Sequence, residues 1–268
     1  MTALLTYSRN ILRTDTQLML QIVFLPGFLG SAHEFLTFAD KIPVGAQILS
    51  LPGSGCSDAE VDFSSINDWM EEQLIGLKVK ECVLYGYSMG GRIAAHYALT
   101  AERPKIAVKG LILESAGFGI ADKQTRKERY RADCAWAEKF ATEPMKDVVT
   151  EWYNQPVFAD LTDEEKERLI VMRSRNIGVR MAKTMTGLST GKMPYLGEAI
   201  RKTSLPLLYL YGENDAKYGE LAAGLQKAGN PAMSIAGIPE CGHNIHMKKP
   251  EAVITEINKY LNKNFGIQ

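Results

Sequence analysis

The stretch over residues 81–92 constrains the fold more than any other part of this chain. It predicts a short buried strand over 82–85, a tight turn and the start of a helix. The turn, residues 86–90, has the sequence GYSMG and fits the pattern G-x-S-x-G. Glycines two positions before and after Ser88 leave room for a strained serine backbone, and the helix directs its N-terminal amides toward developing negative charge. We therefore expect a nucleophile elbow, with an ordinary glycine-rich turn as the alternative.

Strand and helix patterns alternate on both sides of this stretch. Short aliphatic runs closed by glycine or proline predict strands, and apolar residues at helical spacing predict helices. The expected strands are 18–25, 47–51, 82–85, 110–114, 205–211 and, more weakly, 233–238. The expected helices beside them are 31–41, 66–77, 89–102 and one that begins at Pro250. This alternation predicts an α/β fold with right-handed crossovers and a mostly parallel sheet.

The pattern changes between residues 118 and 194, where no convincing strand occurs. Charged segments that favour helices replace it, over residues 123–140, 145–153, 163–174 and 179–188. Thr162 and Glu165 fit a capping box at the start of the third helix. We expect an inserted helical lid over 118–195, between two parts of one core, 1–117 and 196–268. A separate domain is the weaker alternative because the strand pattern resumes directly afterwards.

Composition limits the classes of partner. The 31 basic and 31 acidic residues balance, so the chain as a whole does not favour nucleic acid or an anionic membrane. The 4 cysteines are scattered without zinc-like spacing, which predicts free thiols in a reducing compartment. Residues 1–15 lack a signal-peptide pattern, and no apolar run is long enough to cross a bilayer. We expect a cytoplasmic protein without membrane insertion, as a monomer or a weak homo-oligomer.

Two later residues complete a candidate catalytic triad with Ser88. A serine hydroxyl is a weak nucleophile or base at neutral pH until a neighbouring base takes its proton. Asp215 follows the predicted strand 205–211, and His243 follows the predicted strand 233–238. Because open α/β sheets gather their sites at the carboxyl ends of strands, we expect His243 to move the proton of Ser88 and Asp215 to orient the imidazole.

Other residues compete for these roles. Glu213 is the second candidate for the acid, and Asp122 is a further one. The remaining histidines, His33, His96 and His246, lack a place at a strand end in the order serine, acid, histidine. We expect His96 inside the helix after the elbow, and His246 near the start of the last helix.

A triad of this kind also needs donors for an oxyanion. The backbone N–H of Met89, directly after the serine, is one candidate, and that of Phe28 is the other. Phe28 lies in the loop 26–30 after the first predicted strand, where two glycines suit close approach of a ligand. A simple turn is the alternative for this loop.

These segments resemble the α/β-hydrolases over essentially the whole chain. The resemblance is closer to one group, the 2-succinyl-6-hydroxy-2,4-cyclohexadiene-1-carboxylate (SHCHC) synthases of menaquinone (vitamin K2) biosynthesis. The elbow through Arg92 and the segment 242–244 match this group. The lid motifs are more specific, because lids diverge fastest. They are ERYRAD at 128–133, FATEP at 140–144, WYNQPVFA at 152–159 and RSRN at 173–176.

This resemblance implies an α/β-hydrolase fold with helices on both faces of the sheet, and a carbon–oxygen lyase activity. Such an enzyme eliminates pyruvate from 2-succinyl-5-enolpyruvyl-6-hydroxy-3-cyclohexene-1-carboxylate, a small anionic substrate with several carboxylates. Ser88, activated by His243 and Asp215, would act as the base that removes a ring proton. The substrate contacts implied by the resemblance are Tyr87, Arg92, Arg129, Trp152 and Arg173.

Arginine suits such a substrate because guanidinium groups bind carboxylates bidentately and keep their charge. An ordinary ion pair is the alternative for each arginine, and Arg131 and Arg175 are close neighbours that could share the role. The group commonly has His-Gly-Phe after the first strand, whereas this chain has Pro26 in place of the histidine.

The main alternative function is a serine carboxylesterase or C–C bond hydrolase on the same fold. We expect no cofactor and no metal, because histidines and cysteines do not cluster and no phosphate-binding glycine motif is present.

Overall fold

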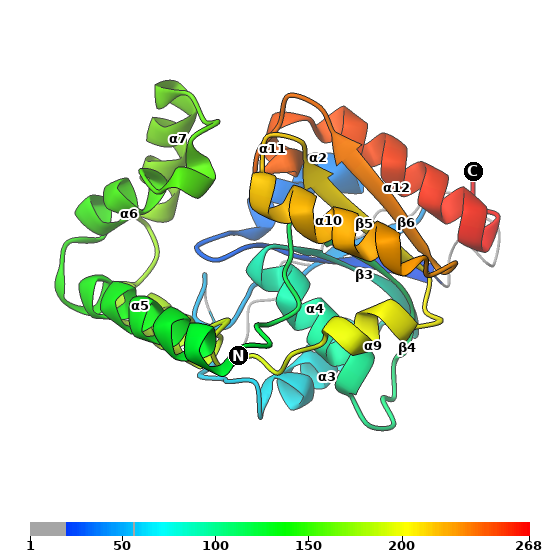
Figure 1. Cartoon of the computed structure of the whole chain (residues 1–268), viewed down its shortest axis with the longest axis horizontal. Coiled ribbons are helices and arrows are strands. Elements are labelled where there is room, and N and C mark those ends of the chain that lie inside the picture. The colour runs from blue at the N-terminus through cyan, green and yellow to red at the C-terminus, as the bar shows by residue number, and fades with distance from the viewer. Residues whose placement is uncertain (1–19, 56) are drawn as a thin grey trace.

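One parallel sheet organises the part of the chain that the computed structural model describes, residues 20–55 and 57–268. Its strand order is β2-β1-β3-β4-β5-β6, and every neighbouring pair is parallel (Figure 1). The strands are β1 (Leu20–Leu25), β2 (Gly45–Ile48), β3 (Glu81–Tyr87), β4 (Ala107–Glu114), β5 (Leu207–Gly212) and β6 (Met233–Ile238). The predicted α/β class is therefore confirmed, and the described sheet is parallel throughout.

The predicted strands agree with the observed ones apart from their ends. Residues 18 and 19 of the first predicted strand lie outside the described residues. β2 begins earlier than expected and ends at Ile48, although the N–H of Leu49 still donates to the carbonyl of Phe24 at 2.9 Å. β3 extends to Tyr87, which brings the strand directly to the candidate serine.

Helices cover both faces of the sheet because side chains alternate along each strand. In β3, Cys82 and Leu84 pack with one core cluster, and Val83 and Tyr85 pack with the other. The first cluster contains residues of α3 (Ile66–Gly76), α4 (Met89–Thr100), α9 (Gly197–Lys202) and α10 (Ala216–Ala228). The second contains residues of η1 (Ala32–Phe35), α2 (Leu36–Ala39) and α12 (Pro250–Phe265).

Two helical expectations need correction. The segment 31–41 forms the short 3₁₀ helix η1 followed by α2, rather than one helix. The sequence interpretation missed α10, which begins directly after Asp215. His246 lies near the start of the last helix, as expected, in the short helix α11 (Ile245–Lys248) directly before α12, which begins at Pro250 as expected.

The predicted lid helices form between β4 and β5. They are α5 (Lys123–Thr142), α6 (Met145–Tyr153), α7 (Asp163–Arg173) and α8 (Gly178–Gly187), with the 3₁₀ turn η2 (Pro156–Phe158) between α6 and α7. The expected capping box is present, because the Thr162 hydroxyl accepts from the N–H of Glu165 and the Glu165 carboxylate accepts from the N–H of Thr162. Figure 1 shows α5, α6 and α7 set to one side of the sheet.

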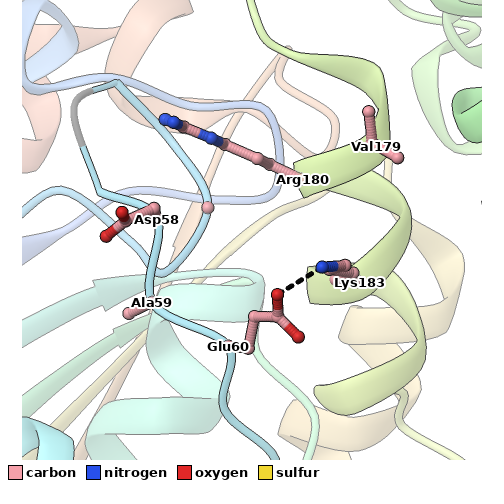
Figure 2. Close-up of a pocket in the computed structure, with 7 residues that line it drawn as sticks. Asp58, Ala59, Glu60, Val179, Arg180 and Lys183 are labelled. Carbon is pink, nitrogen blue, oxygen red and sulfur yellow. Dashed lines mark hydrogen bonds and ion pairs between the residues drawn. The ribbon is translucent and has the colours of Figure 1, made fainter.

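Buried apolar side chains hold these helices together, and Leu29 of the core joins the same cluster. Elsewhere the lid contacts the loop after β2. Lys183 pairs with Glu60 (Figure 2). The hydroxyl of Thr184 donates to the carbonyl of Pro52 at 2.8 Å. A hollow of about 120 Å³ lies at this contact. Within the described residues these contacts anchor α8 to the core, while the division into core and lid at 118–195 stays a prediction.

No helix in the described ranges is both long and apolar enough to cross a membrane. Cys82, Cys134 and Cys241 are free thiols, and Cys56 lies outside the described residues.

Candidate active site

Ser88 lies at a sharp turn between β3 and α4, as the elbow pattern predicts. Its backbone has φ 50° and ψ −108°, a conformation that L-residues rarely adopt. Close packing of backbone around it requires the flanking glycines. A Cβ on Gly86 would lie 2.4 Å from the Cα of Gly91, and one on Gly90 would lie 2.4 Å from the carbonyl oxygen of Pro26. The sequence therefore folds the loop after β1 tightly against the elbow.

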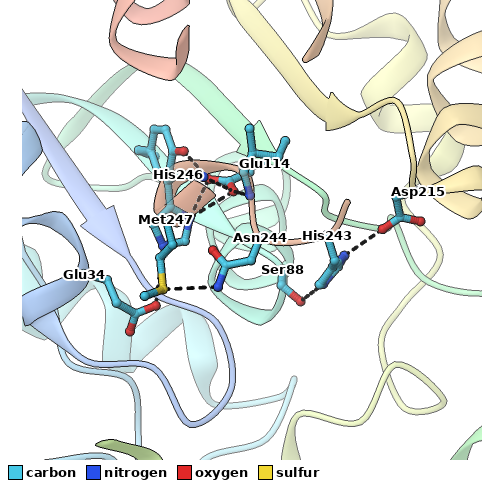
Figure 3. Close-up of polar contacts among 10 residues, drawn as sticks. Glu34, Ser88, Glu114, Asp215, His243, Asn244, His246 and Met247 are labelled. Carbon is cyan, nitrogen blue, oxygen red and sulfur yellow. Dashed lines mark hydrogen bonds and ion pairs between the residues drawn. The ribbon is translucent and has the colours of Figure 1, made fainter. Parts of the chain in front are cut away.

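The structure brings Ser88, His243 and Asp215 into one hydrogen-bonded chain (Figure 3). The Nε2 atom of His243 lies 3.1 Å from Oγ of Ser88, and its Nδ1 atom lies 3.0 Å from Oδ2 of Asp215. His243 and Asp215 are both buried. With Nδ1 donating to the carboxylate, Nε2 is the acceptor that can take the serine proton.

The orientations of Asp215 and of the His243 ring are held by neighbouring groups. Asp215 caps the N-terminus of α10, where its Oδ1 atom accepts the N–H of Tyr218 at 3.4 Å, so its other oxygen faces His243. The imidazole packs against the rings of Tyr218, Tyr87 and Phe158, with ring centroids 5.0, 5.4 and 6.1 Å away. These contacts restrict the ring to the pose that reaches Ser88.

The competing residues lie elsewhere. Glu213 and His33 are exposed, and Asp122 caps α5 by accepting the N–H of Thr125 at 2.7 Å. His96 lies inside α4, as expected, with its Nδ1 atom 3.0 Å from Oδ1 of Asn67. Among the described side chains, that of His243 is the one recorded within hydrogen-bonding distance of the Ser88 hydroxyl.

A cavity of about 840 Å³ opens beside the serine, between the core and the lid. Most of the residues predicted from the sequence line it: Phe28, Tyr87, Ser88, Arg92, Arg129, Trp152, Arg173 and His243. Asp215 lies behind His243, and Met89 is buried in the core at the first position of α4, directly after Ser88. Arg131 and Arg175 are exposed and are not among the described residues that line the cavity.

Arg92 projects from the first turn of α4 into a buried position. Its Nη1 atom donates to the carbonyl of Leu188 at 2.9 Å and to the hydroxyl of Thr190 at 2.6 Å. Burial, with a contribution from the nearby Arg129 charge, lowers the pKa of Arg92 to about 10, so it remains a cation at neutral pH. Within the described ranges Arg92 forms no ion pair, which leaves its charge available to a ligand.

Arg129 and Arg173 each have an acidic partner. The Nε atom of Arg129 lies 2.8 Å from Oδ1 of Asp133, while the arginine side chain remains 38% exposed. The Nη1 atom of Arg173 lies 2.8 Å from Oε1 of Glu34, and both side chains are buried. Burial would lower the pKa of Arg173, but the Glu34 charge outweighs this effect and raises it.

Aromatic side chains connect the loop after β1 to the lid. The ring of Phe28 lies 5.3 Å from Trp152 of α6 and 5.4 Å from Phe140 of α5, between ring centroids. Trp152 also contacts Trp136 at 5.0 Å. Of this cluster, Phe28 and Trp152 line the cavity and give it an apolar surface.

Several residues near the site were missed by the sequence interpretation. Lys217 and Tyr218 line the cavity from α10. Predicting a helix that begins directly after Asp215 would have placed both residues next to the site. Glu34, which lines the cavity, and His246, which is buried next to it, carry no recognisable spacing because they come from two segments far apart in the chain. For residues 20–55 and 57–268, no group of three or more His, Cys, Asp or Glu side chains is arranged to hold a metal ion.

Comparisons with known proteins agree with this geometry. Residues 22–256 match the model of the alpha/beta hydrolase family. The SHCHC synthase of Klebsiella pneumoniae subsp. pneumoniae is 36% identical over 236 residues, which covers 87% of this chain and 90% of that protein. The SHCHC synthase of Escherichia coli O9:H4 is 35% identical over 243 residues, covering 90% of this chain and 93% of that protein.

Solved structures show the same relationship. MenH from S. aureus superimposes with a TM-score of 0.86 at 29% identity, covering 98% of this chain and 99% of that chain. A malate-bound thermophilic esterase from Thermogutta terrifontis gives a TM-score of 0.75 at 21% identity, covering 92% of this chain and 90% of that one. The second likeness concerns the fold alone.

Proposed function

Because the chain belongs to the α/β-hydrolase family and, within it, to the SHCHC synthases, we propose that the cavity beside Ser88 eliminates pyruvate from a carboxylated cyclohexene. The substrate would be 2-succinyl-5-enolpyruvyl-6-hydroxy-3-cyclohexene-1-carboxylate, and the product SHCHC. One observation carries the proposal: the hydrogen-bonded Ser88 and His243 open into a cavity that also presents three guanidinium groups. This arrangement suits a base acting on a substrate with several carboxylates.

His243 would first take the proton of Ser88 through Nε2, with Asp215 stabilising the imidazolium through Nδ1. The Ser88 oxygen would then remove the proton from the ring carbon that bears the succinyl group, whose carbonyl makes that proton acidic. The electron pair moves through the ring double bond, and the C–O bond to the enolpyruvyl group breaks. Enolpyruvate leaves with the electron pair of the broken C–O bond and takes up a proton to become pyruvate.

Negative charge develops on the succinyl carbonyl oxygen during this step. The backbone N–H groups of Phe28 and Met89 are the proposed donors to it, because Phe28 lines the cavity and Met89 begins the helix after Ser88. Preorganised donors of this kind stabilise the enolate without reorganising during the reaction. Pro26, in place of the family's histidine, keeps its backbone against Gly90, which supports an intact loop.

The substrate carboxylates would be held by Arg92, Arg129 and Arg173, while Tyr87 and Trp152 contact the ring and its substituents. Arg92 is the strongest of these candidates, because it is buried and has no acidic partner among the described residues. A cytoplasmic location and a monomeric or weakly associated state belong to the same proposal.

Pyruvate release from the purified intermediate, coupled to NADH oxidation by lactate dehydrogenase, tests this function. We expect Ser88→Ala to lose at least about 10³-fold in kcat, the usual cost of removing a triad member. Ser204→Ala, on an exposed loop, controls for handling of the variant. Normal turnover by Ser88→Ala would exclude the serine as the base. Faster turnover of simple p-nitrophenyl esters, with an acyl burst, would instead identify an esterase.

A further inference from the structure

A second buried carboxylate–histidine array lies beside the triad (Figure 3). His246, three residues after His243, is held between Glu114 at the end of β4 and Glu34 of η1. Its Nδ1 atom lies 2.9 and 3.0 Å from the two oxygens of Glu114, and its Nε2 atom lies 3.5 Å from Oε2 of Glu34. All three side chains are buried. The proposed chemistry at Ser88 uses none of them.

Both carboxylates accept hydrogen bonds from neighbouring groups. Oε1 of Glu114 accepts the backbone N–H groups of Ile245 and His246 at 2.8 and 3.0 Å, and its other oxygen accepts the hydroxyl of Tyr85. Glu34 accepts the backbone N–H of Ser31 and pairs with Arg173. Burial would raise the pKa of Glu34, but the charges of Arg173 and His246 outweigh it and lower the pKa to about 2.

The imidazole of His246 is correspondingly cationic. Burial alone would lower its pKa, but the charge and hydrogen bond of Glu114, with the Glu34 carboxylate 3.5 Å away, raise it to about 9. The ring stacks on Phe35 with centroids 4.6 Å apart and meets the edge of Tyr87 at 4.8 Å, so solvent does not reach it. The pKa values of Tyr85 and Tyr87 lie well above 10, so both phenols stay neutral.

The charges of this cluster therefore balance at neutral pH. Two carboxylates face two cations, Arg173 and protonated His246. Arg173, Glu34 and Tyr87 also line the cavity, so any imbalance acts directly on a bound anion. Without the proton on His246, the cluster would carry one net negative charge beside a site that must accept several carboxylates.

We propose that His246 is a positioning residue that remains protonated between Glu34 and Glu114, so that the charge of Arg173 stays available to a substrate carboxylate. This inference rests on the proposed function. His246 then affects substrate affinity and not proton transfer. Within the described residues, no hydrogen bond joins its ring to Ser88 or to the ring of His243.

Kinetics of neutralising variants test the proposal. We expect His246→Gln to raise KM about tenfold with a smaller change in kcat, as one uncompensated charge a few ångströms from an anion would do. The double variant Glu34→Gln/His246→Gln restores the balance, and its KM should return most of the way to the wild-type value. His96→Gln removes another buried histidine, on α4, and should leave KM unchanged. If the KM of the double variant equals or exceeds that of His246→Gln alone, His246 has only a packing role and the proposal is overturned.

The charge of His246 can also be measured directly in the wild-type protein. Nuclear magnetic resonance of labelled histidine rings, each assigned by through-bond correlation to its own backbone, should show that the ring of His246 is an imidazolium that persists beyond pH 8. A neutral His246 ring at pH 7 would overturn the proposal even if the variants fail to fold. A wild-type protein that releases no pyruvate would refute the proposed function, and the resonance titration would still decide the charge.

Discussion

The carboxylate of Asp160, between η2 and α7 of the lid, accepts the backbone N–H of Gly242 at 2.7 Å. Gly242 directly precedes His243, so a lid residue holds the loop that carries the candidate base. Glycine is required there, because a Cβ would lie 2.4 Å from Cγ of Asp160. Lys248 adds a second contact, with its Nζ atom 2.6 Å from the carbonyl of Asp160 and 3.3 Å from its carboxylate. The position of the lid and the pose of His243 are thus physically connected.

Asp160→Ala should weaken this connection. We expect a loss of about 2 kcal/mol in the free energy of unfolding, the usual scale for a hydrogen bond to a charged group, together with about a tenfold lower kcat. Thermal melts followed by circular dichroism, with steady-state pyruvate release, measure both. Asp160→Asn keeps an acceptor for Gly242 while removing the charge beside Lys248, so its losses should be smaller. Wild-type kcat in Asp160→Ala would show that the contact does not position His243.

Lys217 should add to substrate affinity from the mouth of the cavity. Its Nζ atom lies 5.0 Å from the ring centroid of Tyr218, and within the described residues it forms no ion pair. We expect Lys217→Met to raise KM up to about fivefold, the range for an exposed charge, and to make kcat/KM less sensitive to salt. Lys227→Met, on the last turn of the same helix, is the matched control. If kcat/KM depends on salt identically in both variants, Lys217 does not contribute to substrate binding.

The two paired arginines should respond differently to removal. Arg129→Ala is expected chiefly to raise KM, because the arginine is partly exposed and Asp133 keeps a hydrogen bond from Ser189 at 2.6 Å. Arg173→Ala leaves Glu34 buried without its guanidinium partner and should also cost about 3 kcal/mol of stability. Urea unfolding and KM measurements separate these effects. Adding Glu34→Gln should recover stability in the Arg173 variant, and a failure to do so would contradict the charge argument.

Stability should fall at alkaline pH through His246. Its folded-state pKa of about 9 lies above the ordinary value of 6.5, so the folded protein binds this proton more tightly than the unfolded chain does. The resulting contribution, on the order of 3 kcal/mol, is complete below about pH 6.5 and is lost as the pH rises to about 9. Chemical unfolding from pH 6 to 10 measures it. His246→Gln should remove this slope and His96→Gln should retain it, since burial lowers the pKa of His96.

Local pattern was sufficient to predict most of the fold. The aliphatic runs of β1, β3 and β5 and the elbow at Ser88 are short-range signals, because strand burial and turn sterics act within a few residues. The capping box at Thr162 is equally local. The break of 31–41 into η1 and α2 could not be predicted in this way, because Glu34 is held there by Arg173, far away in the chain.

The sequence alone determined the α/β class, the order serine, acid, histidine, and the arginines that now line one cavity. These follow from periodicity, turn chemistry and motifs that each occupy a short segment. Only the tertiary structure decided which charges remain available: Arg92 forms no ion pair within the described residues, whereas Arg173 pairs with Glu34, which also faces His246. Electrostatic balance depends on distances between side chains from separate elements, and no local pattern encodes those distances.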